Sequence, residues 1–305
     1  MKNILVIRLS AFGDVVQSFG PFAAIRAHHA ADRVSLLTTA PFAPLLAAAP
    51  WFDRVLVDAR PPWWHLPGLL RLSRQLRGFD MVYDLQTSAR TARYFRLAGR
   101  PPWSGIAPGC SHPHANPARD CLHTRERQRE QLAMAGIADV PAPSLAWLTA
   151  AARGFDLPRP YVLLVPGAAP SRPLKRWPAA RYAGLARLLA ARGLAPVVLG
   201  AAAEAAIAAE IAAACPQAID LTGRTRFADI AALATRAAFA VGNDTGPMHL
   251  IAAAGCPCTV LFSADSDPAL TAPRGPDGAW PTVLRAPVLA DLALERVAAA
   301  LPPAT

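Results

Sequence analysis

Lysine, and charged residues in general, are scarce in this sequence. Lys2 and Lys175 are its only lysines, and charged residues make up 17% of the 305 residues, against 53% hydrophobic residues. This composition excludes an intrinsically disordered chain, and 31 prolines without a regular period exclude collagen and a coiled coil. A globular chain of this length is about twice the size of a typical single domain, so we expect two domains.

Long uninterrupted apolar runs are also lacking. Residues 34–52 and 245–264 carry no charge, but prolines and glycines interrupt both, among them Pro44 and Pro257. Helix breakers at this density argue against a membrane-spanning helix of about 20 residues. The apolar run at residues 4–7 is cut by Arg8 and is too short for a secretion signal. We therefore expect a cytoplasmic protein without a transmembrane segment.

The few cysteines form no regular pattern. There are five, an odd number without regular spacing, which is typical of a reducing compartment and excludes a disulfide framework. Cys256 and Cys258 form a Cys-x-Cys pair, but no second pair stands at the spacing that a zinc site needs. We predict buried free thiols here and no metal site.

Acidic residues are too few to balance the basic ones, and the net charge is +10. Residues 60–100 hold eight arginines against Asp80 and Asp84. Within this segment the arginines recur every three or four residues, which places them on helix faces as two stripes: Arg71, Arg74 and Arg77, then Arg90, Arg93, Arg96 and Arg100. The stripes are either solvated surface or a site for an anionic partner. No nucleic-acid motif or basic strand interleaved with aromatic residues is present, so we expect no nucleic-acid partner.

The order of predicted elements indicates an α/β protein with two similar halves. In the first half, strands are predicted at residues 3–9, 34–37, 55–57 and 81–85, and helices at 15–29, with a kink at Gly20-Pro21, and at about 67–77. After a Pro/Ala-rich passage at 140–160, strands are predicted at 161–165, 196–199, 239–241 and 259–262, and helices at 179–192, 204–214, 227–236 and from 247. Alternation of this kind predicts two Rossmann-like, doubly wound parallel-sheet domains, residues 1–155 and 156–305, facing across a cleft.

The segment from residue 241 to residue 250 has the form of an anion-binding loop. A predicted strand ends at Val241, Gly242 and Gly246 let the backbone bend, and Pro247 suits the first turn of a helix. Free N–H groups and the helix dipole favour a phosphate at such an N-terminus. The alternative is that the residues of this Asp-Thr-Gly run are ordinary helix caps.

Three motifs together resemble glycosyltransferase family 9. They are RLSAFGDVVQS near the N-terminus, PGAAPSRPLKRWP in the middle and GNDTGPMHLIAAAGCP in the second half, in the family's order and spacing. The family includes the bacterial heptosyltransferases that build the inner core of lipopolysaccharide. The resemblance implies a GT-B fold, an acceptor-binding domain followed by a donor-binding domain, an ADP-heptose donor, inversion at the anomeric carbon, and no cofactor or metal requirement.

The resemblance also assigns roles to residues. Asp14 matches the general base, with Gly13 beside the acceptor, and Lys175 matches the lysine that contacts the diphosphate. The position of Asp14 at a helix N-terminus favours its ionised form. The donor-binding residues implied are Ser171, Glu204, Thr225, Asp244, Thr245, Gly246 and His249, of which His249 has a supporting role in the loop. The alternatives are a helix cap at Asp14, a solvated Lys175 and an exposed Glu204 at a helix start.

The sequence departs from the family pattern in two motifs. Ala168 and Ala169 stand where many relatives carry a hydroxyl residue, and Ser171 comes later. The usual G-P-T-D-P after the last strand is replaced by residues 263–268, which contain Asp265-Ser-Asp267. This D-x-D run resembles the metal-binding motif of a different transferase fold, and we expect no metal role for it.

The acceptor implied by the resemblance is a lipid A that bears anionic Kdo sugars, or its heptosylated core. We assign Arg71, Arg74, Arg90 and Arg93 to acceptor binding because arginine forms bidentate contacts with carboxylate and phosphate. Trp63, Trp64 and the first arginine stripe are expected to dock on the anionic cytoplasmic face of the inner membrane. A monomer is expected. The alternatives are a family member with another nucleotide-sugar donor or glycan acceptor, a GT-B-like nucleotide-sugar epimerase, and a non-catalytic nucleotide-binding protein.

Overall fold

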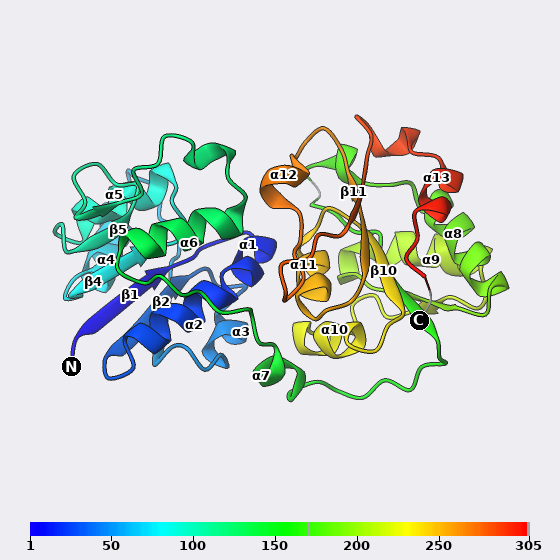
Figure 1. Ribbon diagram of the computed structural model, residues 1–305, viewed down its shortest axis with the longest axis horizontal. Coiled ribbons are helices and arrows are strands. Elements are labelled where there is room, and N and C mark those ends of the chain that lie inside the picture. The colour runs from blue at the N-terminus through cyan, green and yellow to red at the C-terminus, as the bar shows by residue number, and fades with distance from the viewer. Residues whose placement is uncertain (170, 304–305) are drawn as a thin grey trace. The chain divides into compact units, whose positions relative to one another are not determined.

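The computed structural model describes residues 1–169 and 171–303. Within them the chain forms two compact units, residues 1–144 and 145–305, and each is built on a parallel six-stranded sheet (Figure 1). The division after Ser144 precedes the expected boundary at residue 155, because α7 (Ala146–Thr149) packs on a helix of the second unit. No helix in the described part of the chain is both long enough and apolar enough to cross a membrane.

The first unit has the strand order β3-β2-β1-β4-β5-β6. Its strands are β1 (Asn3–Ile7), β2 (Arg33–Thr38), β3 (Arg54–Val57), β4 (Met81–Asp84), β5 (Trp103–Gly105) and β6 (His112–Pro113). Its helices are α1 (Phe12–Gln17), α2 (Phe19–His28), α3 (Ala43–Ala47), α4 (Leu66–Leu76), α5 (Ala89–Leu97) and α6 (Thr124–Met134), with a 3-10 turn η1 (Arg119–Cys121). Helices α1, α2 and α6 pack together, and α4 packs on α5.

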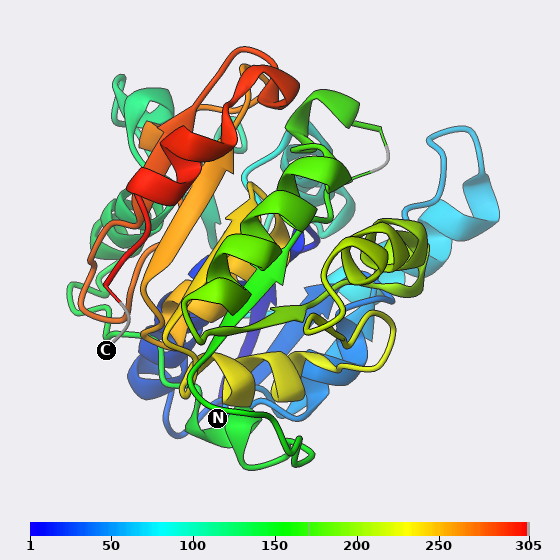
Figure 2. The same cartoon turned by 90° about the vertical axis from the view of Figure 1, so that its right-hand side faces the viewer.

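The second unit repeats this design with the order β12-β11-β10-β7-β8-β9. Its strands are β7 (Tyr161–Val165), β8 (Ala195–Val198), β9 (Ile219–Asp220), β10 (Phe239–Asn243), β11 (Cys258–Phe262) and β12 (Thr282–Arg285). Its remaining helices are α8 (Ala179–Ala191), α9 (Ala205–Ala214), α10 (Phe227–Ala234), α11 (Gly246–Ala253), α12 (Pro268–Thr271) and α13 (Leu294–Ala299), with 3-10 turns η2 (Pro173–Lys175), η3 (Ala202–Glu204) and η4 (Leu289–Asp291). Figure 2 shows α8, α9 and α13 on one face of this sheet.

The central strands are buried on both faces, which explains their continuous apolar runs. Residues 4–7 of β1 and 161–165 of β7 are almost fully buried, as expected for parallel strands covered by helices on both sides. In the second unit, Trp177 and Tyr182 pack edge to face within the same core. The predicted parallel α/β architecture is confirmed.

The first predicted helix differs from the structure. The expectation of one helix over 15–29 with a kink at Gly20-Pro21 is wrong, since α1 ends at Gln17 and α2 begins at Phe19, with Ser18 between them. Pro21 lies in the first turn of α2, where its missing N–H leaves no hydrogen bond unmade. Gly20 is needed for a different reason: a β-carbon there would lie 2.5 Å from the carbonyl oxygen of Pro141.

Candidate active site

Each sheet has a switch point, where the strand order reverses, and the candidate residues lie there. In the first sheet the switch lies between β1 and β4, and in the second between β7 and β10. Ligands of doubly wound folds bind at the carboxyl ends of the strands at such points. Asp14 follows β1, and Asp244 follows β10. The two motifs singled out in the sequence therefore both lie at the switch point of their own sheet, one after the first strand of its unit and the other after the fourth.

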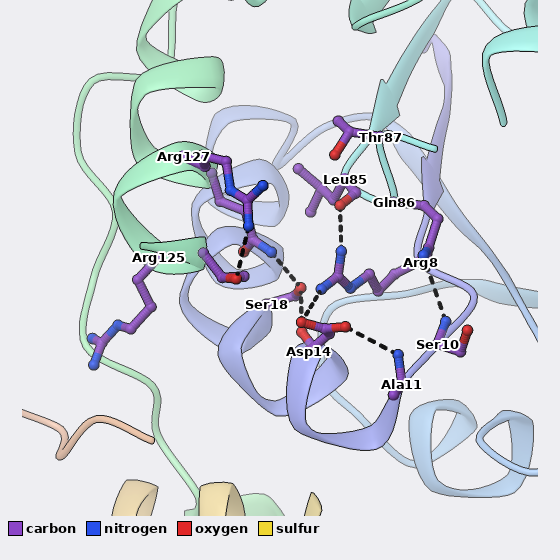
Figure 3. A network of polar contacts seen from close by, with 12 residues as sticks. Arg8, Ser10, Ala11, Asp14, Ser18, Leu85, Gln86, Thr87, Arg125 and Arg127 are labelled. Carbon is purple, nitrogen blue, oxygen red and sulfur yellow. Dashed lines mark hydrogen bonds and ion pairs between the residues drawn. The ribbon is translucent and has the colours of Figure 1, made fainter. Parts of the chain in front are cut away.

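Asp14 is the third residue of α1, and its carboxylate is partly open to solvent. Its Oδ2 accepts a hydrogen bond from the backbone N–H of Ala11 at 3.1 Å, and its Oδ1 lies 3.2 Å from Nη2 of Arg8 (Figure 3). The side chain keeps 37% of its exposure. Asp14 thus combines the predicted helix N-terminus with an ion pair that fixes its direction, while one side of the carboxylate stays accessible.

Arg8 is the buried partner in this pair. It follows the end of β1, and its Nη1 donates a hydrogen bond to the carbonyl oxygen of Leu85 after β4. Burial lowers the pKa of Arg8, whereas the carboxylates of Asp14 and Asp84 raise it. An arginine stays ionised at neutral pH even so, and Arg8 places a positive charge next to Asp14.

Asp84, at the end of β4, is the second carboxyl group beside Arg8. Burial raises its pKa to about 6, against the hydrogen bonds that its Oδ1 accepts from the backbone N–H groups of Gln86, at 3.1 Å, and Thr87, at 3.0 Å. Thr87 has a positive φ of 43°, a backbone conformation that is strained for a β-branched residue. The two hydrogen bonds from Gln86 and Thr87 hold this turn in place.

A polar cavity of about 130 Å³ opens beside Asp14 and Arg8. Arg119 and Arg127 also line it, so three guanidinium groups and one carboxylate share a small space. Arg119 is held by three contacts: its Nη2 donates to the Thr87 hydroxyl at 2.6 Å, its Nε donates to Nδ1 of His114 at 3.2 Å, and its Nη1 donates to Oδ1 of Asp120 at 2.8 Å. Such a cavity suits an anionic ligand that presents a hydroxyl group.

Sequence reasoning missed Arg8, Arg119 and Arg127. Arg119 and Arg127 lie more than a hundred residues beyond Arg8, and only the packing of α6 against α1 brings them together. Arg8 did carry a local signal, because a charged residue at the end of a buried parallel strand indicates a buried counter-charge or a site.

In the second unit, Lys175 and Asp244 form a close ion pair. Lys175 Nζ lies 2.5 Å from Asp244 Oδ2, and the same oxygen accepts a hydrogen bond from the Ser266 hydroxyl at 2.6 Å. The side chains keep only 12% and 8% of their exposure, so a solvated Lys175 is excluded. Ser266 belongs to the D-x-D run that departs from the family pattern. Its flanking Asp267 caps α12, and no cluster of metal-ligating residues exists within the described residues.

Gly242 and Asn243, at the end of β10, determine how the chain passes from β10 to α11. A β-carbon at Gly242 would lie 2.5 Å from the sulfur of Met248. Asn243 is buried and donates through Nδ2 to the carbonyl oxygen of Pro166 at 2.7 Å, while its Oδ1 accepts from the Trp177 backbone N–H at 3.2 Å. Asn243 therefore joins the ends of β7 and β10 to the segment that carries Lys175.

Except for Thr225, the other residues predicted to bind the donor lie at or near the same edge of the sheet. Thr245 is the N-cap of α11 without a side-chain cap hydrogen bond, Gly246 is the first helical residue, and His249 is buried one turn later. Glu204, at the end of η3, accepts from the Ala201 N–H at 2.8 Å, and a β-carbon at Gly167 would lie 3.2 Å from its carboxyl carbon. Ser171 is exposed in the loop before η2.

Thr225 lies apart from the Lys175–Asp244 pair, in a separate cavity. It is half-buried between β9 and α10, and Arg153, Gly154 and Arg226 line the same cavity. Ala168, which replaces the usual hydroxyl residue, is buried, and its carbonyl oxygen accepts from Nη2 of Arg176 at 2.9 Å.

The two arginine stripes differ in their surroundings. Arg71 and Arg74 are exposed on α4, whereas Arg90 and Arg93 on α5 each lie 5.0 Å from the ring of Trp63 as cation–π pairs. Arg77 and Arg100 lie beyond the ends of their helices, so the expectation of unbroken helical stripes through them is wrong. The structure thus joins Arg90 and Arg93 to Trp63 and leaves Arg71 and Arg74 free to meet another molecule.

A family model described as glycosyltransferase family 9 (heptosyltransferase) matches residues 69–279, which is more than half of the chain. The chain belongs to glycosyltransferase family 9. It is 34% identical to lipooligosaccharide heptosyltransferase 2 of Haemophilus influenzae over 113 residues, 35% of this chain and 32% of that protein. The match therefore spans about a third of the length of this curated relative.

Solved structures share the fold of this family 9 chain. A glycosyl transferase family 9 protein from Veillonella parvula superposes with a TM-score of 0.79 at 20% identity, covering 98% of this chain and 95% of that one. The E. coli heptosyltransferase WaaC with ADP gives 0.75 at 22% identity, covering 97% and 98%. These likenesses confirm the predicted GT-B type of fold.

Proposed function

We propose that this family 9 chain is an inverting glycosyltransferase. It moves a heptose from an ADP-activated donor to a hydroxyl of the anionic, lipid-linked inner core of lipopolysaccharide, either Kdo-lipid A or the heptosylated core. The observation that carries the proposal is the carboxylate of Asp14, half-open and paired with buried Arg8 beside a cavity rich in arginine. Family membership favours sugar transfer over an epimerase and over a non-catalytic nucleotide-binding protein.

The second unit would hold the donor. The N-terminus of α11, with Thr245 and Gly246, offers backbone N–H groups and the positive end of a helix dipole to the diphosphate. Lys175 lies against Asp244 beside this loop and supplies a positive charge where the leaving diphosphate gains negative charge. The presence of ADP on the E. coli relative supports this choice of nucleotide.

The first unit would hold the acceptor, and its arginines account for an anionic one. Arg8, Arg119 and Arg127 line the cavity beside Asp14, and guanidinium groups bind carboxylates and phosphates with two parallel hydrogen bonds. An acid sugar such as Kdo carries both a carboxylate for these arginines and hydroxyls for Asp14.

The reaction is a single displacement. Asp14 takes the proton of the acceptor hydroxyl as its oxygen forms a bond to the anomeric carbon, and the bond from that carbon to the diphosphate breaks to release ADP. Attack from the face opposite the leaving group inverts the anomeric carbon. Since the charge of Lys175 serves the leaving group, we expect no metal requirement and no loss of rate with a chelator.

Transfer with purified protein tests the proposal. With ADP-heptose and Kdo-lipid A, we expect ADP release that depends on the acceptor and an inverted linkage in the product. Asp14→Asn should lower kcat by about a hundredfold or more and leave the Kd for ADP within about twofold, which is the scale of losing a general base. Asp139→Asn, at an exposed carboxylate of the same unit, is the matched control.

Three outcomes would contradict the assignment. ADP release without acceptor would make the chain a hydrolase, and interconversion of the sugar nucleotide would make it an epimerase. Turnover by Asp14→Asn at the wild-type rate would remove Asp14 from the role of base. Activity only with another nucleotide sugar would keep the fold and mechanism and change the donor.

We further propose that the chain acts as a monomer on the cytoplasmic side of the inner membrane.

A further inference from the structure

One end of α4 and the loop before it carry a cluster of exposed apolar side chains. Trp64 keeps 80%, Leu66 68% and Leu70 59% of their exposure. Nine large hydrophobic side chains are exposed among the described residues, and three of them fall within these seven positions. A soluble surface usually scatters such side chains singly, so a cluster of this kind indicates a contact surface.

The inner side of α4 already has its partners. Leu72 and Leu76 are buried in the core of the first unit. Leu66 and Leu70 are one helical turn apart and share a different, uncovered side. The helix α4 therefore has two apolar sides. One packs in the core of the first unit, and the other is exposed to solvent.

In the loop before α4, Trp63 packs against other side chains of the protein, whereas Trp64 is exposed to solvent. Trp63 packs edge to face on Tyr94, with ring centres 6.2 Å apart, and lies 5.0 Å from the guanidinium groups of Arg90 and Arg93. Trp63 therefore anchors the loop, and Trp64 is the indole that stays exposed. A β-carbon at Gly68 would lie 2.7 Å from Pro61, so the loop also packs closely on the helix start.

The charges around this face have one sign. Between Asp58 and Asp80 the chain has four arginines, Arg60, Arg71, Arg74 and Arg77, and no acidic residue. Asp58 is buried and accepts a hydrogen bond from the Tyr94 hydroxyl at 2.7 Å, so it does not offset these charges at the surface. An exposed tryptophan and leucines beside arginines match a bilayer interface with anionic headgroups, where the indole lies at headgroup level.

We propose that Trp64, Leu66, Leu70, Arg71 and Arg74, here called the Trp64 face, dock the first unit on an anionic phospholipid bilayer. This deepens the proposed function, on which it rests for its purpose, because a lipid-linked acceptor is presented at such a surface. The apolar side chains enter the interface, and the arginines contact lipid phosphates. Arg71 and Arg74 are thereby assigned to the membrane, and the cavity arginines beside Asp14 to the acceptor sugar.

Vesicle co-sedimentation of the full chain tests the docking directly. We expect binding to vesicles with about a third phosphatidylglycerol, at least tenfold stronger than to phosphatidylcholine alone, and weakening between about 0.1 and 0.5 M salt. Trp64→Ser with Leu70→Ser should lower the partition coefficient at least tenfold, and Arg71→Gln with Arg74→Gln should remove most of the salt dependence. The matched control is Leu188→Ser with Arg187→Gln on α8, since Leu188 is also partly exposed, at 37%.

Each result has a fixed meaning. Equal binding of both vesicle types, or full binding by the Trp64 and Leu70 variant, overturns the docking. Self-association of the wild type that this variant abolishes would assign the face to a second copy and also overturns it. Quenching of the wild type by brominated lipid that Trp64→Phe removes supports insertion of this indole.

A water-soluble, delipidated acceptor separates this inference from the proposed function. The Trp64 and Leu70 variant should transfer sugar to the soluble acceptor within twofold of the wild type and lose at least tenfold in rate on a vesicle-embedded acceptor. Transfer by a wild type that binds no vesicles would overturn the docking alone. Vesicle binding by a chain that transfers no sugar would overturn the proposed function alone.

Discussion

Arg8 and Asp14 face each other after β1, with Nη2 of the buried guanidinium 3.2 Å from Oδ1 of the carboxylate. Arg8 also donates to the carbonyl of Leu85, so it ties the candidate base to the end of β4. A carboxylate held in this way points in one direction without the entropy loss of ordering it for each turnover. We therefore expect Arg8 to act as a positioning residue for Asp14.

Replacing Arg8 should impair catalysis more than donor binding. Arg8→Met removes the partner of Asp14, and we expect kcat to fall about tenfold or more with the Kd for ADP unchanged, measured by steady-state kinetics and calorimetry. Arg8→Lys keeps the charge and should recover part of kcat. Wild-type kcat in Arg8→Met, with thermal unfolding unaltered, would remove Arg8 from this role.

Asp84 should make stability depend on pH. Its pKa is about 6 in the folded state, raised by burial from 3.8, so the native state binds its proton more tightly than the unfolded chain does. The free energy of unfolding should then fall as pH rises from about 4 to 6, by on the order of 3 kcal/mol, and stay reduced above that range. Denaturant unfolding at several pH values measures this slope.

Asp84→Asn provides the comparison, because an amide does not titrate. Relative to the wild type, its free energy of unfolding should rise between pH 4 and 6. Asp139→Asn, at an exposed position in the same unit, should follow the wild-type curve. Parallel curves for Asp84→Asn and the wild type would contradict this assignment of the proton.

The alternation of strands and helices could be predicted from the sequence, since buried parallel strands and amphipathic helices leave periodic patterns. The short strands β5, β6 and β9 left none, because two or three residues carry no period. Trp63 and Trp64 could not be told apart either. Their difference arises from Tyr94 and Arg90 on α5, which tertiary packing brings to one indole only.

The loop after β10 could be predicted from the sequence, whereas the cavity beside Asp14 could not. Residues 242–246 are contiguous, and their two glycines indicate a bend of the backbone at this point. The arginines of the cavity come from the end of β1, from η1 and from α6, and nothing local links them. These arginines come together only when the three elements pack in the folded unit.

His114 should govern acceptor affinity through Arg119. Its Nδ1 accepts from Arg119 Nε at 3.2 Å, which leaves Nε2–H to donate to Glu130 Oε2 at 3.0 Å. His114→Leu removes the hydrogen-bond partner of Arg119 Nε. We expect the KM for the acceptor substrate to rise about fivefold or more, with a smaller change in kcat. His114→Gln should restore part of the affinity. The neighbouring His112→Leu is the control, and an equal rise of KM there would reduce the effect to general loosening of the sheet edge.

Lys175 should bind the donor diphosphate. Its Nζ lies 2.5 Å from Asp244 Oδ2 in a nearly buried pair. Loss of a charged hydrogen bond is worth about 1.5–3 kcal/mol, so Lys175→Met should weaken ADP binding roughly tenfold to a hundredfold in calorimetry. Lys2→Met changes the other lysine, which is exposed at the N-terminus, and should bind ADP as the wild type does. Unchanged ADP affinity in Lys175→Met would place the diphosphate elsewhere.

Asp229 should hold the segment after α7 to the second unit. It is the third residue of α10, its side chain is fully buried, and it accepts from Nη2 of Arg153 at 2.7 Å and from Nη2 of Arg226 at 3.2 Å. Burial opposes its ionisation, but the hydrogen bonds from these arginines and their backbone N–H groups outweigh burial and hold its pKa well below 3.8. Its stabilising effect is therefore complete above about pH 4 and is lost as the pH falls below that value.

Removing this carboxylate should destabilise the second unit at neutral pH. Asp229→Ala removes a buried carboxylate that accepts hydrogen bonds from two half-exposed guanidinium groups, and we expect a loss of about 1.5–3 kcal/mol in the free energy of unfolding. Faster proteolytic cleavage within residues 150–160 should accompany it, because Arg153 no longer fixes that segment. Glu210→Ala, at an exposed position on α9, is the control and should change unfolding by less than about 0.5 kcal/mol. A similar small change in Asp229→Ala would mean that packing of α7 alone holds the segment in place.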